Sequence, residues 1–297
     1  MPTSVAGWQF IDKFDVEGNR FTGTIPNYFG DLTTLRTLSF YRNNLLGTIP
    51  KSFSKLKNLL LLDLGMNSLT GTIHSELGTL SQLESFYVNR NALRGPLPNF
   101  NFMPNITYFD TSNNVLTGPL PSSFATWNKL FEIDFHGNLH SGTIPSSIGY
   151  LTNMKSLYLD DNRLTGTIPA SLSLLKNMEN LFVYRNYLTG KIPIDIVELQ
   201  KLKDLKLSDN LLTGTIPQNI NRMTKLNSLL LQNNYLTMGS LTIIPNNYFS
   251  NATQDGNLDL SNNCLAYSSI INPSQNTLPT QCYRKYCDVL SKPATYL

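Results

Sequence analysis

The chain of 297 residues is poor in cysteine, in histidine and in charge of either sign. Lys and Arg total 23 and Asp and Glu total 20, and a formal net charge of only +3 excludes a strongly basic protein that binds nucleic acid or anionic membranes. No apolar run approaches the roughly 18 residues that a membrane-spanning helix needs. The opening residues, MPTSVAGWQFIDKF, lack the basic segment and apolar stretch of a secretory signal. The sequence therefore predicts a soluble chain without a membrane span.

The three cysteines are Cys264, Cys282 and Cys287, so any disulfide is expected near the C-terminus. Three is an odd number, and at least one cysteine is therefore free or pairs elsewhere. With three histidines in the whole chain and no nucleophile accompanied by a base, the sequence predicts no enzyme, no metal site and no cofactor.

A repeat of 24 residues dominates the rest of the sequence. Its clearest mark is Asn-x-apolar-x-Gly, and the interval between successive asparagines is 24 residues except for one interval of 23 and a last one of 29. A fixed period of this length indicates a solenoid, because one unit cannot bury its own apolar face and must stack on its neighbours. The repeated asparagines are Asn19, Asn43, Asn67, Asn91, Asn114, Asn138, Asn162, Asn186, Asn210, Asn234 and Asn263.

The letters of one unit predict its structure. Apolar residues three and five positions before the Asn, such as Leu157 and Leu159, have the spacing of a strand with one buried face. The Asn stands in an apolar frame, so its amide should be buried and bonded to the backbone of its own turn and of adjacent coils. The Gly admits positive φ, and an Ile-Pro or Leu-Pro pair after it should end strand pairing. A stretch such as Ser52 to Leu59 suits a short helical turn on the opposite side.

The stretch from Leu157 to Pro169, LYLDDNRLTGTIP, resembles the plant-type leucine-rich repeat, L-x-x-L-x-x-L-x-L-x-x-N-x-L-x-G-x-I-P-x-x-L-G-x-L-x-x. The resemblance covers roughly residues 8 to 265 and extends to receptor ectodomains and polygalacturonase-inhibitor-like proteins of this kind. It implies an α/β repeat solenoid of about 11 coils, an arc with a concave parallel sheet and short 3-10 or irregular convex segments. We expect one solenoid domain over residues 1–265 and a capping tail with cysteines over residues 266–297.

The sequence departs from the family pattern in several places. It starts inside a repeat without a cysteine-bearing cap, and no kinase motif or membrane anchor follows. The short unit should lose its residue in the outer connection between Gly95 and Ile106, which would leave the sheet intact. The segment from Thr237 to Gly256 is longer than usual, and a degenerate coil is favoured over a specificity loop. Peptide receptors resembling this family can hold a free carboxylate with an Arg-x-Arg pair, which does not occur in this chain.

If the fold is right, the side chains that point out of the concave sheet stand four, two and one residues before each Asn. In the middle of the array these positions hold aromatic residues beside carboxylates, and exposed aromatic and Arg side chains are usual anchors of recognition. Such a face suits a cationic or hydroxyl-rich ligand, although Tyr and Phe also simply suit half-exposed strands. The predicted ligand-binding residues are Tyr87, Asp110, Asp134, His136, Tyr158, Asp160, Phe182, Tyr184 and Arg185.

The resemblance therefore implies a non-enzymatic protein that binds an extracellular peptide, protein or glycan, and that has no nucleic-acid partner. The triplets at Asn105 and Asn251 fit the glycosylation acceptor pattern and agree with an extracellular location. A disulfide from Cys264 to Cys282 or Cys287 could close the open end of the core. A structural or surface-coat protein without a specific ligand is the alternative.

Two further interpretations are weaker. Triplets such as Thr165-Gly166-Thr167 would form a partial ladder of threonines at the solenoid pitch, as on an ice-binding surface, but T-G-x-I-P is already the structural consensus of the repeat. His136 with Asp134 and Asp160 could sketch a metal or acid–base site, but a solvated polar strand face is the favoured interpretation because no nucleophile or complete ligand set accompanies them.

Overall fold

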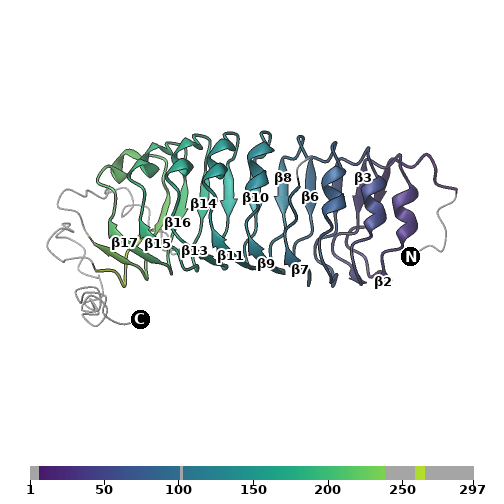
Figure 1. Ribbon diagram of the computed structural model, residues 1–297, viewed down its shortest axis with the longest axis horizontal. Coiled ribbons are helices and arrows are strands. Elements are labelled where there is room, and N and C mark those ends of the chain that lie inside the picture. The colour runs from purple at the N-terminus through teal and green to yellow at the C-terminus, as the bar shows by residue number, and fades with distance from the viewer. Residues whose placement is uncertain (1–6, 101–102, 238–257, 265–297) are drawn as a thin grey trace.

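The computed structural model describes residues 7–100, 103–237 and 258–264. Its coils stack along the long axis of the molecule, from the purple N-terminal end to the green C-terminal end (Figure 1). Each coil contributes one short strand to a parallel sheet, which we call the main sheet. The strands of this sheet, in spatial order, are β1 (Lys13–Asp15), β3 (Thr37–Ser39), β5 (Leu61–Asp63), β6 (Ser85–Tyr87), β8 (Tyr108–Asp110), β10 (Glu132–Asp134), β12 (Ser156–Tyr158), β14 (Asn180–Phe182), β16 (Asp204–Lys206), β18 (Ser228–Leu230) and β20 (Leu258–Asp259).

The opposite side of the solenoid carries single turns of 3-10 helix. Most begin directly after the proline of the repeat, whose extended backbone precedes the turn, as at Pro50 and Pro169. These turns confirm the predicted convex segments. They are η1 (Asn27–Asp31), η2 (Lys51–Lys55), η3 (Ser75–Thr79), η4 (Ser122–Thr126), η5 (Ser146–Tyr150), η6 (Ala170–Leu174), η7 (Ile194–Glu198) and η8 (Ile220–Arg222).

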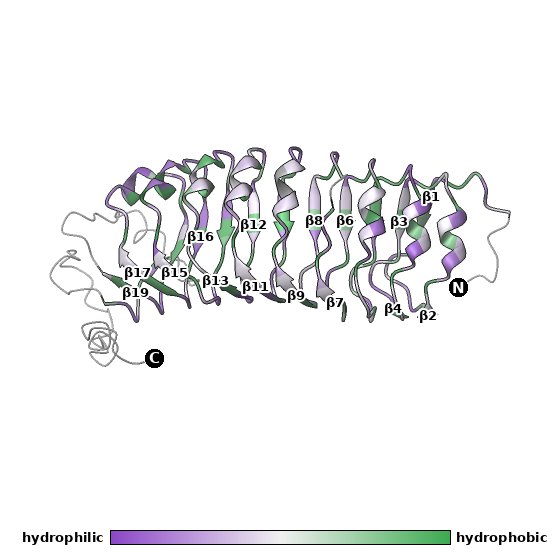
Figure 2. Ribbon diagram, viewed as in Figure 1, coloured by the Kyte–Doolittle hydropathy of each residue, from purple (hydrophilic) through white to green (hydrophobic). Residues whose placement is uncertain are grey.

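One core runs through the stack. The middle residue of each main-sheet strand points inward, as Leu157 and Leu181 do with no exposed surface, while the flanking residues point outward. In Figure 2 this appears as a green band at the middle of strands such as β6 and β8. The buried Leu, Ile and Phe of successive coils form a single cluster, so each coil is stabilised by its neighbours.

The repeated asparagines hold adjacent coils together as predicted. Asn162 Nδ2 donates to the carbonyl of Phe135 in the preceding coil at 2.9 Å, and also to the carbonyls of Leu159 and Asp160 in its own turn at 3.2 and 3.1 Å. Its Oδ1 accepts from the His140 N–H of the preceding coil at 3.0 Å. One side chain thus bonds four backbone groups, and it is the partner of the buried His140 N–H, while each of the three carbonyls also accepts from a second donor.

The segment around the repeat glycine forms additional parallel sheets beside the main sheet, which the sequence interpretation missed. The Ile-Pro and Leu-Pro pairs end strand pairing as expected, because lateral strands such as Val115–Pro119 and Leu139–Thr143 stop before these pairs. Two other prolines, Pro96 and Pro119, stand directly after the repeat glycine and lie within these lateral sheets. Both occupy the last position of their strand, where the missing N–H costs little. The lateral strands are β2 (Thr22–Thr24), β4 (Asn44–Leu46), β7 (Arg94–Pro96), β9 (Val115–Pro119), β11 (Leu139–Thr143), β13 (Arg163–Thr165), β15 (Thr189–Lys191), β17 (Leu211–Thr215) and β19 (Tyr235–Thr237).

The two kinds of sheet differ in register. In the main sheet equivalent residues of neighbouring coils face each other, as Asp134 faces Tyr158. In the lateral sheets the partners are offset by two residues, so that Thr143 faces Thr165 and Thr167 faces Thr189. The offset staggers successive lateral strands along the strand direction, whereas the main-sheet strands stay level, and we call the face of the main sheet the concave face.

Because of the same offset, the threonines do not form the ladder that the sequence predicted. Equivalent threonines do not stand opposite one another, because a shift of two residues moves them about 7 Å along the strand. The row that begins at Thr167 and Thr189 therefore continues to Leu211, and the row through Thr143 and Thr165 has only two threonines in line.

The short unit leaves the main sheet intact, as predicted. Tyr87 of β6 pairs with Asp110 of β8 in the regular register although they are 23 residues apart. The longer segment before Asn263 falls on residues 238–257, outside the described residues, but β20 still pairs with β18 beyond it.

Candidate functional site

The main-sheet register brings most of the predicted ligand-binding residues together. Strands β8, β10, β12 and β14 end at outward-facing side chains that form one continuous row from Asp110 through Asp134 and Tyr158 to Phe182. Tyr87 extends this row toward the N-terminus. Just past the strand ends lie His136, Tyr184 and Arg185. We call this set the central patch: Tyr87, Asp110, Asp134, His136, Tyr158, Phe182, Tyr184 and Arg185.

The C-terminal half of the central patch is aromatic. Tyr158 and Phe182 meet edge to face with ring centroids 5.0 Å apart, and Phe182 is 6.4 Å from Tyr184. Lys206 Nζ lies 4.2 Å from the centre of the Phe182 ring, and the Arg185 guanidinium lies 5.8 Å from the centre of the Tyr184 ring. The three rings are half-buried, so they can contact a ligand without rearranging.

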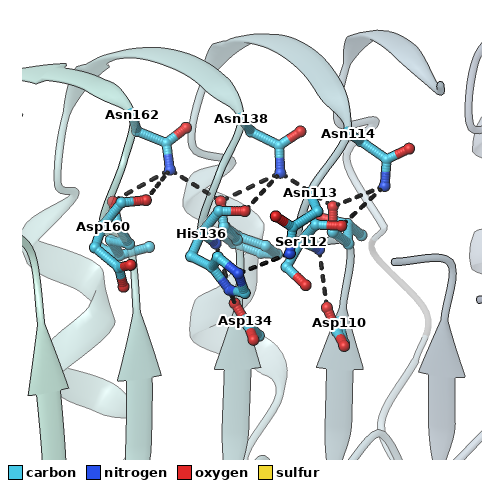
Figure 3. Close-up of polar contacts among 12 residues, drawn as sticks. Asp110, Ser112, Asn113, Asn114, Asp134, His136, Asn138, Asp160 and Asn162 are labelled. Carbon is cyan, nitrogen blue, oxygen red and sulfur yellow. Dashed lines mark hydrogen bonds and ion pairs between the residues drawn. The ribbon is translucent and has the colours of Figure 1, made fainter. Parts of the chain in front are cut away.

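The N-terminal half is acidic, and its aspartates have a local structural cause. Each accepts a hydrogen bond through Oδ1 from the backbone N–H two residues later: Asp110 from Ser112 at 2.8 Å and Asp134 from His136 at 3.0 Å (Figure 3). Asp63 does the same with Gly65 at 2.9 Å. These Asx turns redirect the chain where the strand ends, and the second carboxylate oxygen needs no backbone partner.

Three carboxylates of this region, those of Asp63, Asp110 and Glu132, lack a Lys or Arg partner among the described residues. The pKa of Asp63 and that of Asp110 are both raised to about 6, first by burial, and for Asp110 next by the neighbouring Asp134. The pKa of Glu132, which faces Tyr108 from the next strand, is raised by burial and then by Asp134 and Asp110. Within residues 7–100, 103–237 and 258–264, no Lys or Arg forms an ion pair with Asp63, Asp110 or Glu132. This surface therefore disfavours its own negative charge and would gain from a bound cation.

His136 is held by its neighbours on both sides. Its Nδ1 lies 2.6 Å from Asp134 Oδ1, and its Nε2 lies 2.7 Å from Asn113 Nδ2 (Figure 3). The hydrogen bond to Asp134 is the largest cause of a raised His136 pKa. In the part of the chain that the structure describes, no group of three or more His, Cys, Asp or Glu side chains could hold a metal ion.

Asp160 does not lie on the open face, where the sequence interpretation placed it. Only 3% of its surface is exposed, and its carboxylate is hydrogen-bonded to the Tyr184 side chain. The pKa of Tyr184 is raised by its own burial and by a hydrogen bond with Asp160. Asp160 therefore positions the Tyr184 ring, and its carboxylate is not open to a ligand.

Sequence reasoning missed Glu132, Asn113 and two more exposed aromatic residues, Tyr108 and Phe131. Glu132 and Tyr108 point outward at the first position of their strands, six residues before the Asn. Because outward-facing side chains alternate along a strand, the position six before the Asn also faces outward, and including it would have identified both residues. Asn113 precedes the Asn of its coil, and at this position nine non-glycine residues of the described coils have positive φ, Arg42 and Arg185 among them. Nothing in the repeat letters signals this strained position.

The predicted modification sites are only partly within the described residues. Asn105 is half-buried, and its Nδ2 donates to the Ser81 carbonyl at 3.0 Å. Asn251, Cys282 and Cys287 lie outside the described residues. Cys264 is disulfide-bonded.

Comparison with known proteins decides the family. The Leucine Rich Repeat family model matches residues 11–32, 34–56, 153–175 and 201–223, which places four matches in register with the observed coils. The chain contains leucine-rich repeats. Among proteins with curated descriptions, none is similar enough in sequence to count as a relative.

Solved leucine-rich-repeat structures share its fold. The plant peptide hormone receptor RGFR1, in complex with RGF2, is 30% identical with a TM-score of 0.75, over 89% of this chain and 46% of that chain. The Arabidopsis receptor kinase HAESA, in complex with the peptide hormone IDA and the co-receptor SERK1, is 32% identical with a TM-score of 0.73, over 76% of this chain and 38% of that chain. The present chain thus spans less than half the length of either receptor chain.

A plant ice-binding protein also shares the fold. It is 27% identical with a TM-score of 0.61, over 75% of this chain and 74% of that chain. In this leucine-rich-repeat chain, the described helices are all short turns, and none has the length and apolar character to cross a bilayer.

Asp110→Asn should make the protein more stable at pH 7.5, by roughly 2 kcal/mol. The amide oxygen of Asn can still accept from the Ser112 N–H, while the charge that burial and Asp134 disfavour is removed. Because the folded pKa is raised from 3.8 to about 6, the gain should shrink as the pH falls from 6 toward 4, where the folded carboxyl is protonated and the unfolded one begins to bind its proton.

Urea unfolding followed by circular dichroism at pH 7.5 and pH 4 measures this difference. Asp15→Asn is the matched control, because Asp15 makes the same Asx turn with the Glu17 N–H at 3.1 Å but lies at the end of the sheet. An equal gain from both variants would show that the crowding of carboxylates around Asp110 is not the cause.

Proposed function

We propose that the protein is a non-enzymatic recognition module that binds an extracellular peptide or protein through the central patch. The ligand presents at least one Lys or Arg side chain to the carboxylates, while an apolar or aromatic side chain stacks on Tyr158 and Phe182. The observation that carries this proposal is that Asp110 and Glu132, two half-buried carboxylates, have no Lys or Arg partner among the described residues and lie near the half-buried Tyr158 and Phe182 rings.

The similarity to receptors solved with peptide hormones supports a ligand of this class. It also supports an extracellular location, in agreement with the acceptor triplet at Asn105. This chain has no Arg-x-Arg pair to hold a free carboxylate of a peptide. Recognition therefore depends on the positive groups of the ligand. A glycan would use the same rings for stacking but has no need of the carboxylates, so it is the less favoured ligand.

Ice binding receives less support, although a plant ice-binding protein shares the fold. An ice-binding face needs hydroxyl groups in long regular rows. The two-residue offset of the lateral sheets limits the aligned threonines to short diagonal rows that soon meet Leu211 or Tyr187. We therefore place the function on the concave face.

Tyr158→Ala/Phe182→Ala should remove at least nine-tenths of the captured partner when the purified protein is used as bait in an extracellular extract. Truncating two packed anchor rings typically costs enough binding energy for a loss of tenfold or more. The matched control is Tyr150→Ala/Leu174→Ala, which removes an aromatic and an aliphatic side chain that are 64% and 51% exposed on the convex side.

Circular dichroism of both variants verifies that they are folded. If the concave and convex variants capture the same proteins as the wild type, or if the wild type captures nothing, the central patch is not a recognition site and a scaffold role is favoured instead.

A further inference from the structure

A second pair of exposed aromatic residues lies on the main sheet, away from the central patch. Tyr108, the first residue of β8, is 41% exposed, and Phe131, directly before β10, is 36% exposed. Their ring centroids are 6.3 Å apart. We call these two residues the rim pair. They stand where the strands begin, whereas Tyr184 and Arg185 stand past the point where the strands end.

The fold does not require aromatic residues at the rim. The position of Phe131 is held in neighbouring coils by Thr107 and Lys155, and the position of Tyr108 is held by Ser85. Each of these coils forms the same strand in the same register with a polar side chain there. The rim pair therefore exposes two rings without a packing reason, and such rings mark contact surfaces.

Glu132 lies between the rim pair and the central patch. It faces Tyr108 across the strands, and its pKa is raised by burial, by Asp134 and by Asp110. Lys155, directly before the next strand β12, places its Nζ 5.6 Å from the centre of the Phe131 ring and forms no ion pair with Glu132 among the described residues. Aromatic rings thus lie on both sides of Glu132: the rim pair where the strands begin, and the rings of the central patch where they end.

The dimensions of this surface fit an extended peptide. From Phe131 to Tyr184 the path runs five residue positions along the strands and two strands across, which gives roughly 20 Å at 3.3 Å per residue and 4.8 Å per strand. An extended chain covers that distance with about six residues. A small ligand could not reach both groups of rings.

We infer that one extended peptide crosses the main sheet diagonally, with an aromatic or large apolar side chain on the rim pair, a second on Tyr158 and Phe182, and a Lys or Arg between them over Glu132 and Asp110. This inference rests on the proposed function and specifies its ligand class and direction of binding. Charge complementarity selects the basic centre, because in the described part of the chain neither Glu132 nor Asp110 forms an ion pair with a Lys or Arg.

The test uses a synthetic peptide, N-acetylated Trp-Ser-Ser-Arg-Ser-Trp-amide, and three variants of it: citrulline for Arg, Ser for the first Trp, and Ser for the last Trp. Isothermal titration gives the Kd of each for the wild type and for Tyr108→Ser/Phe131→Thr. These substitutions copy the residues that Ser85 and Thr107 provide in the neighbouring coils, so they preserve the strand.

We expect the rim variant to weaken binding of the full peptide at least tenfold. One of the two peptides that lack a terminal Trp should bind the wild type and the rim variant equally, because it no longer reaches the rim, and this peptide gives the direction of the chain. Citrulline should weaken binding at least tenfold, and Glu132→Gln should abolish the preference for Arg.

The outcomes separate the two proposals. If Tyr158→Ala/Phe182→Ala weakens binding and the rim variant does not, the diagonal path is wrong while the central patch stands. If a rim effect is equal for all four peptides, the rim pair acts on the fold and the inference also fails. If the wild type binds none of the peptides, the inference is overturned, and the capture experiment above still decides the proposed function.

Discussion

Asn162→Leu is expected to lower the free energy of unfolding by about 3–5 kcal/mol. Leucine fills a similar volume, but it leaves the His140 N–H without its partner. It also takes one of two hydrogen bonds from each of the Phe135, Leu159 and Asp160 carbonyls. Each buried polar group that loses its hydrogen bond costs about 1–3 kcal/mol. The sum is reduced because some of these groups can relax toward other partners.

Guanidinium unfolding monitored by circular dichroism measures the effect, and Asn153→Leu is the matched control. Asn153 lies exposed on the convex side, where its Nδ2 makes a single hydrogen bond to the Asn128 carbonyl at 2.6 Å. Its loss should cost less than 1 kcal/mol. Because coils contact only their neighbours, the Asn162 variant should also unfold in two steps, with a break at this coil. Equal costs for both variants would contradict the role assigned to the buried asparagines.

The repeat sequence predicts the structure of a coil well because every coil must bury the same apolar positions and pair the same backbone groups. Leu157 and Leu159 must be buried, and Asn162 must satisfy the backbone around it, so the sequence predicts the main sheet, the convex turns and the buried amides. The lateral sheets were missed because Pro and Gly are poor strand residues, and only the three-dimensional closeness of coils pairs segments such as Val115–Pro119.

The candidate site was predicted only in outline. Alternation identified which side chains face outward, and the structure brings Tyr158, Phe182 and Tyr184 together as that argument implied. It could not show that Tyr184 hydrogen-bonds to Asp160, because this depends on the lengths and rotamers of two side chains in adjacent coils. It also could not show which carboxylates lack cations, since that depends on where Lys155 and Lys206 point.

The acidic row combines a structural and a recognition role in the same side chains. One oxygen of Asp110 ends its strand by an Asx turn, which a neutral Asn could do as well. Retaining a charge whose pKa is raised to about 6 makes the free protein less stable at neutral pH. A bound Lys or Arg would reverse that penalty, so ligand binding and stability are coupled at this row.

His140 is an ionisable side chain at a core position that the repeat normally fills with leucine. It occupies the position of Leu116 and Leu164 in the adjacent coils and has no exposed surface. The carbonyls of Thr117 and Gly118 slightly favour its protonated form, but neither ring nitrogen makes a hydrogen bond of ordinary geometry within the described residues. Burial lowers the pKa of His140 from 6.5 to about 4, so the ring is neutral in the folded protein at pH 7.

This lowered pKa determines how acid acts on the core. Between pH 6.5 and 4 the unfolded chain binds a proton at His140 that the folded chain excludes, so stability falls as the pH falls through this window. A shift from 6.5 to about 4 corresponds to a loss on the order of 3 kcal/mol. The raised pKa values of Asp63 and Asp110 act in the opposite direction, because those carboxyls bind protons more readily when folded.

His140→Leu should therefore separate these opposing effects. At pH 7.5 we expect it to raise the free energy of unfolding by about 1–2 kcal/mol, because two unpaired buried nitrogens are replaced by the residue that packs in both adjacent coils. At pH 4.5 the advantage over the wild type should grow by a further 2–3 kcal/mol or so, since the variant no longer excludes a proton. Urea unfolding at the two pH values measures both gains, with His74→Leu, outside the core, as control. An advantage that stays constant between pH 7.5 and 4.5 would mean that His140 is already protonated or hydrated in the folded core.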